Sequence, residues 1–547
     1  MAEYILNNYE SQVKSKLDYK SNSKLGINSM ENANELDKKF DLFSSSNQNI
    51  CEQNEIAIIG ISGKYPKANN LDEFWENLKH GRNCIEEIPS NRWDWRDTFD
   101  KDKMKTGKIN SKWGGFIEDV DAFDPLFFNI TPQEAEKMDP QERLFLQCVY
   151  NTIEDAGYTR DSLKKYKENN MGGNVGVFVG ATFSDYHLYG VEEQLKGNMI
   201  ALSGSNSSIA NRVSYYFDFT GPSIAIDTMC SSSLTAIHLA CNSIYQNECK
   251  MAIAGGVNLS LHPNKYLFLS QHNFLSNEGR CDSFGNQGNG YVPGEGVGSI
   301  LLKKLSDAIA DGDHIYGIIK ATAINHGGKT NGFYVPNPAA QANVISKALS
   351  DAHLNPENIS YIEAHGTGTA LGDPIEIAGL TKAFRKYTNK NMFCSIGSIK
   401  SNIGHLEAAA GIAAVTKVLL QLKYKQLVPS IHSEILNDKI DFKNTPFKIQ
   451  DKLEKWDRKN GLPLIAGISS FGAGGSNSHI IIEEYKDNIS NDMEEDFSDN
   501  TALILLSAKN EDSLKKQAIN LLNSIKENDV KRGQLKNIEY TLQVGRE

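Results

Sequence analysis

The segment "GPSIAIDTMCSSSLTAIHLACNSIY" places a cysteine, Cys230, where two patterns meet. Apolar alternation typical of a strand stops at Asp227, and a helical apolar stripe begins at Leu234. Cys230 is therefore predicted at the start of a helix, where free backbone N–H groups and the helix dipole favour an anion. We expect this position to lower the thiol pKa from about 8.5, the adjacent serines to cap the helix, and a backbone N–H of the turn to stabilise an oxyanion.

The other cysteines have no comparable context. Most free cysteines are small buried residues, and this interpretation is applied to Cys51, Cys84, Cys148, Cys241, Cys249 and Cys394. The eight cysteines form no CxxC pair, and the chain has no HExxH motif. The sequence therefore predicts no disulfide framework, no metal ion and a reducing, cytoplasmic setting.

Two of the twelve histidines resemble Cys230 in position. His365 ends a predicted strand in "ISYIEAHGTGTALGDPIEI", and His405 precedes an Ala-rich helix in "SIKSNIGHLEAAAGIAAV", with Lys400 on the preceding turn. Ligands of open α/β sheets bind at the edge where strands give way to helices. Taken singly, each histidine is more often a capping or surface residue, but the three residue types on equivalent edges predict one shared site.

Two further segments carry local signals. In the His365 segment, Asp373, Pro374 and Glu376 fit the N-cap, N1 and N3 positions of a capping box. In "SSFGAGGSNSH" the glycines permit positive φ, and Phe471 is expected to gate a cavity. This loop is neither GxGxxG nor a P-loop, and it leads into a strand-like "HIIIEE", so no nucleotide cofactor is predicted.

Strand-like and helix-like segments alternate along the chain, which indicates an α/β architecture. In each half a strand ends in small polar residues before an Ala-rich helix, and this echo suggests duplication. Polar residues dominate 1–53 and 487–500, which are interpreted as linkers. In the tail, "ALILLSAKNEDSLKKQAINLLNSI" predicts a strand, an acidic turn and an amphipathic helix, the start of a small α/β unit.

Composition excludes several classes of protein. The chain has 547 residues, which is too long for one simple core. Its net charge is -11, and it has no Lys/Arg cluster of the kind that binds nucleic acid. The longest apolar stretch, Ala408 to Leu422, contains Lys417 and is too short to span a bilayer. The first residues lack the apolar core of a signal peptide. No nucleic-acid or membrane partner is expected.

Taken together, "DTMCSSSLTAIHLA", "EAHGTGTALGDPIE", "KSNIGHLEAAAGI" and "SSFGAGGSNSH" resemble the β-ketoacyl synthase (ketosynthase) domains of modular polyketide synthases. "EIAIIGISGKYP", "MDPQERLFLQ" and "NHGGKTNGFYVPNP" add matches, the last resembling synthases whose acyltransferase is a separate protein. The resemblance implies the thiolase fold, a duplicated five-layered αβαβα core. It implies a linker at 1–53, a ketosynthase domain at 54–485 with halves at about 54–300 and 301–485, and a linker with a partial α/β subdomain at 486–547.

The resemblance also assigns roles to residues. Cys230 is the acylated nucleophile, and His365 and His405 are the catalytic histidines, supported by Lys400. The oxyanion donors are the backbone N–H groups of Cys230 and Phe471. Substrate and pantetheine contacts fall on Thr367, Thr369, Met229, Gly472, Ala473, Gly474 and Asn477, with Met229 and Ala473 replacing residues common in relatives.

The implied reaction is decarboxylative condensation of a Cys-bound acyl chain with a malonyl unit on an acyl carrier protein, which extends the chain by two carbons. The implied partners are upstream and downstream carrier domains bearing phosphopantetheine, a discrete acyltransferase and a second copy of the chain, with no bound cofactor. A non-elongating acyl-transfer or gatekeeping domain and, less favoured, a cysteine thioesterase or hydrolase remain open. A thiolase is disfavoured because no cysteine follows Cys394.

Overall fold

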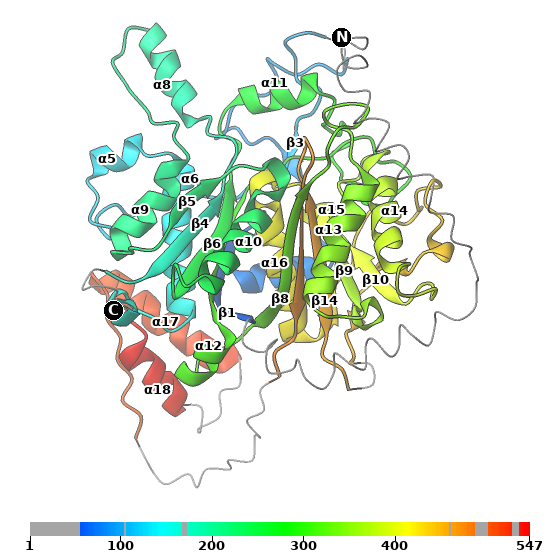
Figure 1. Ribbon diagram of the computed structural model, residues 1–547. Helices are drawn as coiled ribbons and strands as arrows, with labels where there is room; N and C mark the ends of the chain where they lie inside the picture. The colour runs from blue at the N-terminus through cyan, green and yellow to red at the C-terminus, as the bar shows by residue number, and fades with distance from the viewer. Residues whose placement is uncertain (1–54, 103–104, 167–171, 459–460, 487–500, 528–534) are drawn as a thin grey trace, which may run out of the picture. The chain divides into compact units, whose positions relative to one another are not determined.

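The computed structural model describes residues 55–102, 105–166, 172–458, 461–486, 501–527 and 535–547 (Figure 1). The predicted linkers at 1–53 and 487–500, and Cys51, lie outside the described residues.

Two sets of five strands share one topology. The first comprises β1 (Ile56–Lys64), β4 (Val175–Gly180), β5 (Ser223–Ile226), β6 (Met251–Asn258) and β7 (Gly296–Lys304), in the order β5-β4-β6-β7-β1. The second comprises β8 (Gly317–His326), β9 (Tyr361–Glu363), β10 (Cys394–Gly397), β14 (Ile465–Phe471) and β15 (Ser476–Glu483), in the order β10-β9-β14-β15-β8. If the strands of each half are numbered one to five along the chain, both sets run in the order third, second, fourth, fifth, first. The repeat agrees with the duplication that the sequence suggests.

Strand directions repeat as well. In each half the pairs involving the fifth strand are antiparallel, and the second strand pairs in parallel with the third and fourth. Antiparallel pairing of β1 with β8 joins the halves, and β12 (Phe447–Ile449) extends the sheet beyond β10. The parallel central strands are buried on both faces, which explains continuous apolar runs such as "MAIAGGVN".

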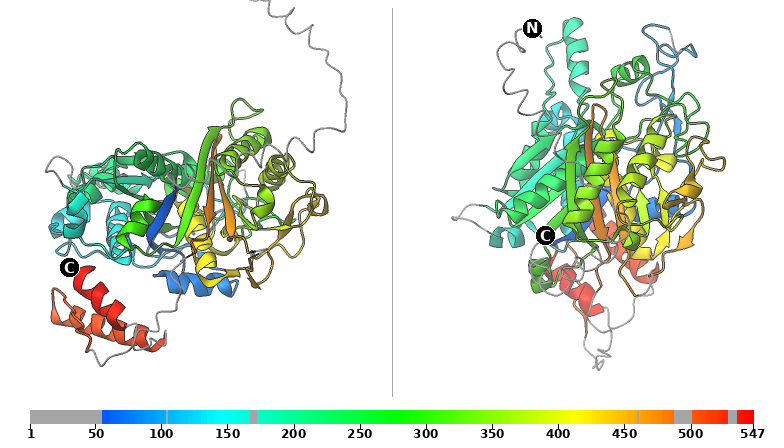
Figure 2. Two further views of the ribbon diagram at one scale, coloured as in Figure 1. Left: turned by 60° about the horizontal axis from the view of Figure 1, so that its bottom comes forward. Right: turned by 45° about the vertical axis from the view of Figure 1, so that its right-hand side comes forward.

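Helices form three layers around these strands (Figures 1 and 2). The central layer holds α10 (Ser232–Tyr245) and α16 (Ala410–Tyr424), which contact each other and strands of both halves. Small residues allow this close approach, since a Cβ on Gly411 would lie 2.6 Å from Leu234. The outer layers hold α6 (Pro140–Asp155) and α9 (Ser207–Phe217) on the first half, and α13 (Pro338–Asp351) and α14 (Gly372–Phe384) on the second. The α/β prediction and the αβαβα layering are confirmed.

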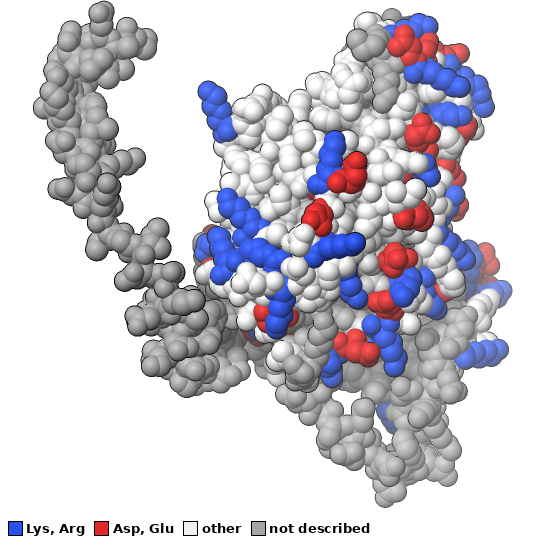
Figure 3. Space-filling model, turned by 90° about the vertical axis from the view of Figure 1, so that its right-hand side faces the viewer, with Lys and Arg blue, Asp and Glu red and all other residues white. Residues whose placement is uncertain are grey.

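Shorter elements complete the described chain: α4 (Leu71–Lys79), β2 (Glu86–Glu87), β3 (Trp113–Gly114), α5 (Pro132–Lys137), α7 (Arg160–Leu163), α8 (Tyr186–Leu195), α11 (Pro263–Gln271), α12 (Leu305–Asp311), α15 (Lys400–Ile403), β11 (Gln426–Leu427) and β13 (Glu454–Lys455). Among the described residues, no helix combines the length and apolar character needed to traverse a bilayer. The face in Figure 3 carries basic and acidic side chains interspersed among uncharged ones, with one row of basic groups.

The tail departs from its prediction. It contains α17 (Glu511–Glu527) and α18 (Leu535–Val544), so the predicted helix is present, but the expected strand around Leu503 is extended chain outside any sheet. The Leu503 N–H donates to Glu539 Oε1, and Gln543 Nε2 donates to the Leu503 carbonyl. Side chains of α18 thus satisfy this backbone in place of a neighbouring strand, and a strand needs such a neighbour.

Candidate functional site

Cys230 lies on a tight turn between a strand and a helix. β5 ends at Ile226, residues Met229–Ser231 form a 3₁₀ turn, and α10 begins at Ser232. Met229 has a φ of 56°, which is uncommon for a residue with a side chain, and its N–H donates to Asp227 Oδ1 at 2.9 Å. The predicted position of Cys230 at a helix start is confirmed.

The prediction that the serines cap this helix is wrong. Ser232 Oγ accepts from the Thr228 N–H at 2.9 Å and donates to the Met229 carbonyl at 2.6 Å. Ser231 Oγ donates to the Thr228 carbonyl at 2.9 Å, and Ser231, the N-cap residue, makes no side-chain cap. The strained turn has polar backbone groups closer to these hydroxyls than the helix N–H groups are, so the serines hold the turn instead.

The expected lowering of the Cys230 pKa is also wrong. Burial raises the pKa of this thiol to about 11, and contacts with the N–H groups of Ala473 and of Cys230 itself, together with the Lys400 charge, offset only part of that rise. Loss of water around the sulfur therefore outweighs the favourable field of the helix. At neutral pH the resting group is a thiol, and its proton must leave as the sulfur attacks.

The fold brings the three predicted reactive side chains together. Sγ of Cys230 and one ring nitrogen each of His365 and His405 lie within 4.8 Å of one another. The two imidazole rings are 5.3 Å apart between centroids and almost perpendicular. Cys230 follows the third strand of the first half, whereas His365 follows the second strand of the other half and His405 precedes α16. Strand edges of both halves thus converge on one site, as the sequence predicts.

Both histidines are neutral. Burial and the Lys400 charge hold the pKa of His365 and of His405 well below the usual value. His405 Nδ1 accepts from the Glu407 N–H at 2.9 Å, so its proton is on Nε2. Within the described residues, His405 Nε2 and His365 Nδ1 have no hydrogen-bond partner.

A cysteine and two histidines at this spacing also form a donor set suitable for a soft metal ion. A metal needs the lone pair of the ring nitrogen that faces it. The Glu407 N–H occupies Nδ1 of His405 and leaves a proton on Nε2. The tautomer therefore favours donation to a substrate oxygen over metal coordination.

Lys400 is buried beside these groups, with 2% of its surface exposed. Burial lowers its pKa, and the carboxylates of Glu363 and Glu376 oppose that change. Lys400 in turn lowers the pKa of both histidines and of Cys230. It thus acts on the electrostatics of the whole cluster.

The predicted capping box at the start of α14 is wrong. The helix begins at Gly372, and its N-cap residue is Leu371 without a side-chain cap. Glu376 instead accepts the N–H groups of His365 and Gly366 at 2.7 and 2.8 Å, and Asp373 accepts that of Gly368 at 3.2 Å. The two carboxylates point back to the loop because the buried backbone N–H groups there need acceptors. They fix the loop that carries His365.

The glycine loop packs against the cysteine turn. Ser470 Oγ donates to the Cys230 carbonyl at 2.6 Å, and a Cβ on Gly472 would lie 2.3 Å from the Thr228 carbonyl. The N–H that contacts the sulfur is that of Ala473. The Phe471 ring lies 5.8 Å from that of His365. This contact makes the Ala473 N–H a candidate for the second oxyanion donor, the role that was predicted for Phe471.

The remaining predicted contacts lie around this loop. Thr367 and Thr369 have hydroxyl oxygens 3.2 Å apart, and Asn477 Nδ2 donates to Asn325 Oδ1 at 2.9 Å. Gly474 has a φ of 95° and supports the Phe333 ring. Met229 is 37% exposed. The substrate roles of these residues stay predictions.

Sequence reasoning missed three supporting residues: Asp227, Ser470 and Glu407. Each lies inside a segment singled out for another residue, and each acts on backbone geometry. The contact of Ser470 with Cys230 joins distant segments and leaves no spacing pattern. The contacts of Asp227 with Met229 and of Glu407 with His405 are local, but they depend on the turn geometry that the residue types alone do not indicate. The interpretation of Cys84, Cys148, Cys241, Cys249 and Cys394 as small buried residues is confirmed.

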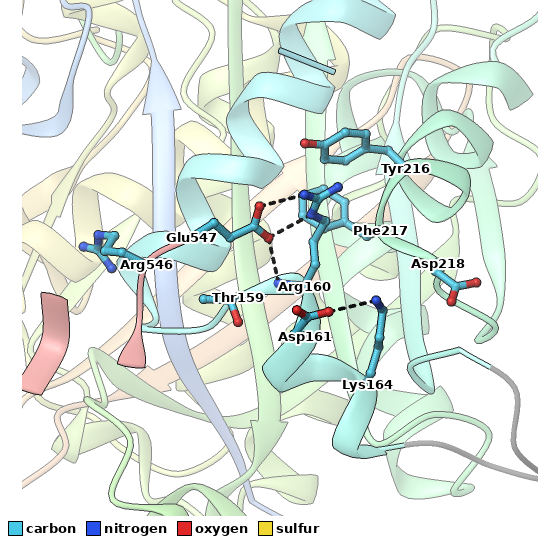
Figure 4. Close-up of a pocket in the computed structure, with 9 residues that line it drawn as sticks. All are labelled: Thr159, Arg160, Asp161, Lys164, Tyr216, Phe217, Asp218, Arg546 and Glu547. Atoms are coloured by element: carbon cyan, nitrogen blue, oxygen red, sulfur yellow. Dashed lines mark hydrogen bonds and ion pairs between the residues drawn. The ribbon is translucent and has the colours of Figure 1, made fainter. Parts of the chain in front are cut away.

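A separate cavity of about 470 Å³ lies at α7, lined by Thr159, Arg160, Asp161, Lys164, Tyr216, Phe217, Asp218, Arg546 and Glu547 (Figure 4). Arg160 pairs with Glu547, and Asp161 pairs with Lys164. Because these charges neutralise each other and neither cysteine nor histidine lines the cavity, it has no counterpart of the Cys230, His365 and His405 cluster.

Comparisons with known proteins agree with this geometry. Residues 53–308 match the family described as Beta-ketoacyl synthase, N-terminal domain; residues 316–434 match its C-terminal domain; and residues 437–544 match the Ketoacyl-synthetase C-terminal extension. The chain is 63% identical over 506 residues to polyketide synthase PksL of Bacillus subtilis, covering 91% of this chain and 11% of that protein. It is 56% identical to polyketide synthase ThaG of Burkholderia thailandensis, covering 90% of this chain and 9% of that protein. The chain thus spans about a tenth of these relatives.

Two solved structures are similar. The oxazolomycin ketosynthase domain OzmH KS7 of Streptomyces albus is 48% identical with a TM-score of 0.84, covering 90% of this chain and 84% of that one. The ketosynthase from module 6 of the bacillaene synthase of Bacillus subtilis is 43% identical with a TM-score of 0.80, covering 90% and 80%.

Proposed function

Because this chain belongs to the β-ketoacyl synthase family and is a ketosynthase of the polyketide synthase type, we propose that it extends an acyl chain by two carbons through decarboxylative condensation. The observation that carries the proposal is the approach of the Cys230 sulfur to two neutral imidazoles within 4.8 Å. A nucleophile alone suffices for acyl transfer, but an adjacent pair of donors also suits an enolate.

In the first step, Cys230 takes the acyl group from the phosphopantetheine thioester of a carrier protein. The sulfur attacks the carbonyl carbon, and the N–H groups of Cys230 and Ala473 face the developing oxyanion. Collapse expels the pantetheine sulfur, which takes the proton that the Cys230 thiol loses. No cofactor is needed in this step, because the proton lost by the Cys230 thiol is gained by the pantetheine thiol.

In the second step, a malonyl thioester loses CO₂, and the bonding electrons form an enolate. The enolate oxygen accepts hydrogen bonds from the imidazoles of His365 and His405, which are neutral and therefore remain donors. The enolate carbon attacks the acyl carbonyl on Cys230, and the sulfur leaves as a thiolate, which takes up one proton from water to restore the thiol. The product is a β-ketoacyl chain on the second carrier.

The second candidate is a gatekeeping domain that transfers the acyl chain without extending it. It uses Cys230 and the oxyanion donors but has no need of the pair of histidines, and their joint position favours extension. A cysteine hydrolase that uses His405 as its base is disfavoured because the N–H of Glu407 holds Nδ1 of His405, leaving the proton on Nε2. That nitrogen cannot accept a proton from water.

Mass spectrometry of the protein and of carrier proteins separates these functions. The protein is treated with an acyl-pantetheine thioester and then with a malonyl carrier protein. An extended chain on the carrier supports the proposal. Acyl-Cys230 without extension indicates a gatekeeper, and free acid indicates a hydrolase; either result overturns it.

The partners follow from the reaction. The substrates arrive on phosphopantetheine of acyl carrier domains, and the Thr367–Thr369 loop is proposed to contact that arm. We also propose a discrete acyltransferase as the source of the malonyl unit, supported by the segment "NHGGKTNGFYVPNP" and its resemblance to synthases of that kind. The cytoplasmic setting and the residue boundaries of the domains stay predictions.

The exposed edge of β5 supports assembly as a homodimer. Among the described strands β5 pairs with β4 alone, and Ile224 on it is 40% exposed. The carbonyls of Pro222 and Ile226 accept from β4, so by strand alternation the N–H and C=O groups of Ser223 and Ala225 point outward. An unpaired edge of this kind is a template for a second copy, and the Cys230 turn follows it directly.

The substitution Ala225→Pro is expected to shift the protein from dimer to monomer. Proline removes the outward N–H of an edge strand and leaves the pairing with β4 intact. Sedimentation velocity across a range of concentrations measures the change. A matched control is Ala57→Pro on internal β1, which should unfold the protein instead. An unchanged dimer for a folded Ala225→Pro protein contradicts pairing through β5.

A further inference from the structure

A buried group of charged and polar residues adjoins His405. Glu407 follows His405 by two residues, Lys265 comes from α11, and Tyr291 comes from the segment before β7. The Tyr291 hydroxyl donates to Glu407 Oε1 at 3.2 Å, and Lys265 Nζ lies 2.5 Å from Glu407 Oε2. Lys265 is wholly buried and Glu407 is 4% exposed. The mechanism above uses none of these side chains.

The backbone at Glu407 is strained. Its φ is 48°, a left-handed conformation that residues with a side chain adopt rarely. This conformation directs the Glu407 N–H to His405 Nδ1 at 2.9 Å. Conformations of this kind persist only where the surroundings hold them. The contacts of the Glu407 carboxylate with Lys265 and Tyr291 anchor its side chain.

The same group also contacts the imidazole. The Tyr291 ring lies 4.8 Å from the His405 ring between centroids. Lys265 is itself fixed, because its Nζ donates to Asn258 Oδ1 and to the Leu259 carbonyl, each at 3.1 Å. A rigid chain of contacts therefore runs from β6 through Lys265 and Glu407 to the ring of His405.

We propose that Glu407, held by Lys265 and Tyr291, is a positioning residue that fixes the Nε2–H tautomer of His405 and thereby serves condensation and not acylation. The inference rests on the proposed function, since condensation is the step that needs this donor. An imidazole with the opposite tautomer presents a lone pair to the enolate oxygen, and that contact is repulsive.

The electrostatics of the site separate the two steps. The charge of Glu407 raises the pKa of the Cys230 thiol. Replacing Glu407 by a neutral residue therefore lowers the pKa of the Cys230 thiol. Because the thiol then ionises more easily, acylation is not expected to become slower. A selective loss of extension cannot then come from a less reactive sulfur.

The test compares Glu407→Gln, Lys265→Met and the double variant Lys265→Met/Glu407→Gln with the wild-type protein. Acylation of Cys230 by an acyl-pantetheine thioester and extension with a malonyl carrier protein are timed separately by mass spectrometry. We expect extension by Glu407→Gln to fall by about tenfold to a hundredfold, in the range that general acid–base and donor contributions span, while acylation changes by less than about threefold. The double variant removes both buried charges, so it stays informative if one single variant misfolds.

Lys303→Met is the matched control. Lys303 is 1% exposed and pairs with Asp311 and Asp313 within the first half, away from the cysteine turn. It reports the general effect of losing a buried ion pair. Equal losses of acylation and extension in the Glu407 variants, parallel to those of Lys303→Met, would overturn the proposal, as would unchanged extension.

A spectroscopic readout makes the result independent of turnover. Nitrogen-15 NMR of histidine-labelled protein distinguishes protonated Nε2 from protonated Nδ1, and a His405→Asn sample assigns the signal. The wild-type protein should show His405 as the Nε2–H tautomer, and Glu407→Gln should show a mixture. If the wild-type protein extends no chain, the proposed function fails while the tautomer still tests this inference; an unchanged tautomer in both Glu407 variants overturns it.

Discussion

The variant Cys230→Ala is expected to take up no acyl group from a pantetheine thioester, a loss on the order of 10⁴-fold or more in acylation rate. The sulfur is the nucleophilic atom among the three side chains that converge within 4.8 Å. Alanine removes it and leaves the Ala473 and residue 230 N–H groups without an acyl oxyanion to stabilise. Intact-protein mass spectrometry after incubation with the thioester measures the added mass.

The control for this variant is Cys241→Ala. Cys241 lies on the same helix, α10, and is wholly buried, and burial raises the pKa of its thiol to about 12. It has no access to substrate, so acylation should proceed as in the wild-type protein. Acyl mass on Cys230→Ala that maps to another cysteine would contradict the assignment of the nucleophile.

The position of the reactive residues was predictable from sequence because it depends on local patterns. Cys230, His365 and His405 each follow or precede a recognisable strand or helix, and edges of neighbouring strands meet in α/β folds. The two halves share one strand order. For this reason the strand-to-helix connections that carry His365 and His405 in the second half face the connection that carries Cys230 in the first half. Lys400 follows from the same reasoning, because it lies on the turn before His405.

The predictions that failed depend on competition between tertiary interactions, which cannot be read from the sequence. Burial of the Cys230 sulfur outweighs the helix field, and this depends on residues that cover it from distant segments. Asp373 and Glu376 have the spacing of a capping box but bind the His365 loop, whose buried N–H groups compete for the same carboxylates. The strand expected near Leu503 has a short apolar run but finds no strand beside it in the described residues. In each case a tertiary partner decides between two local options.

The variant His365→Ala is expected to separate the two halves of the reaction. Removing one hydrogen-bond donor to an oxyanion typically costs about 10²- to 10³-fold in rate, or about 2.7–4 kcal/mol. His365 is neutral because burial and Lys400 lower its pKa, so the side chain contributes a hydrogen bond and not a charge. Acylation of Cys230 should persist, because the N–H groups that face its oxyanion belong to the backbone of Cys230 and Ala473. Extension of the acyl chain with a malonyl carrier protein should collapse.

His365→Asn provides the matched comparison, since asparagine retains an N–H donor of similar reach, and it should recover part of the extension that alanine loses. His479→Ala controls for the loss of a buried imidazole: His479 is wholly buried, and its Nδ1 lies 3.0 Å from Ser469 Oγ, so its removal should affect both steps alike through stability. Single-turnover measurements of acylation and extension on each variant decide the outcome. Normal extension by His365→Ala would assign enolate stabilisation to His405 alone, and equal loss of both steps would make His365 part of the acylation machinery. Either result would replace the division of roles in which the backbone serves the acyl oxyanion and the two imidazoles serve the enolate.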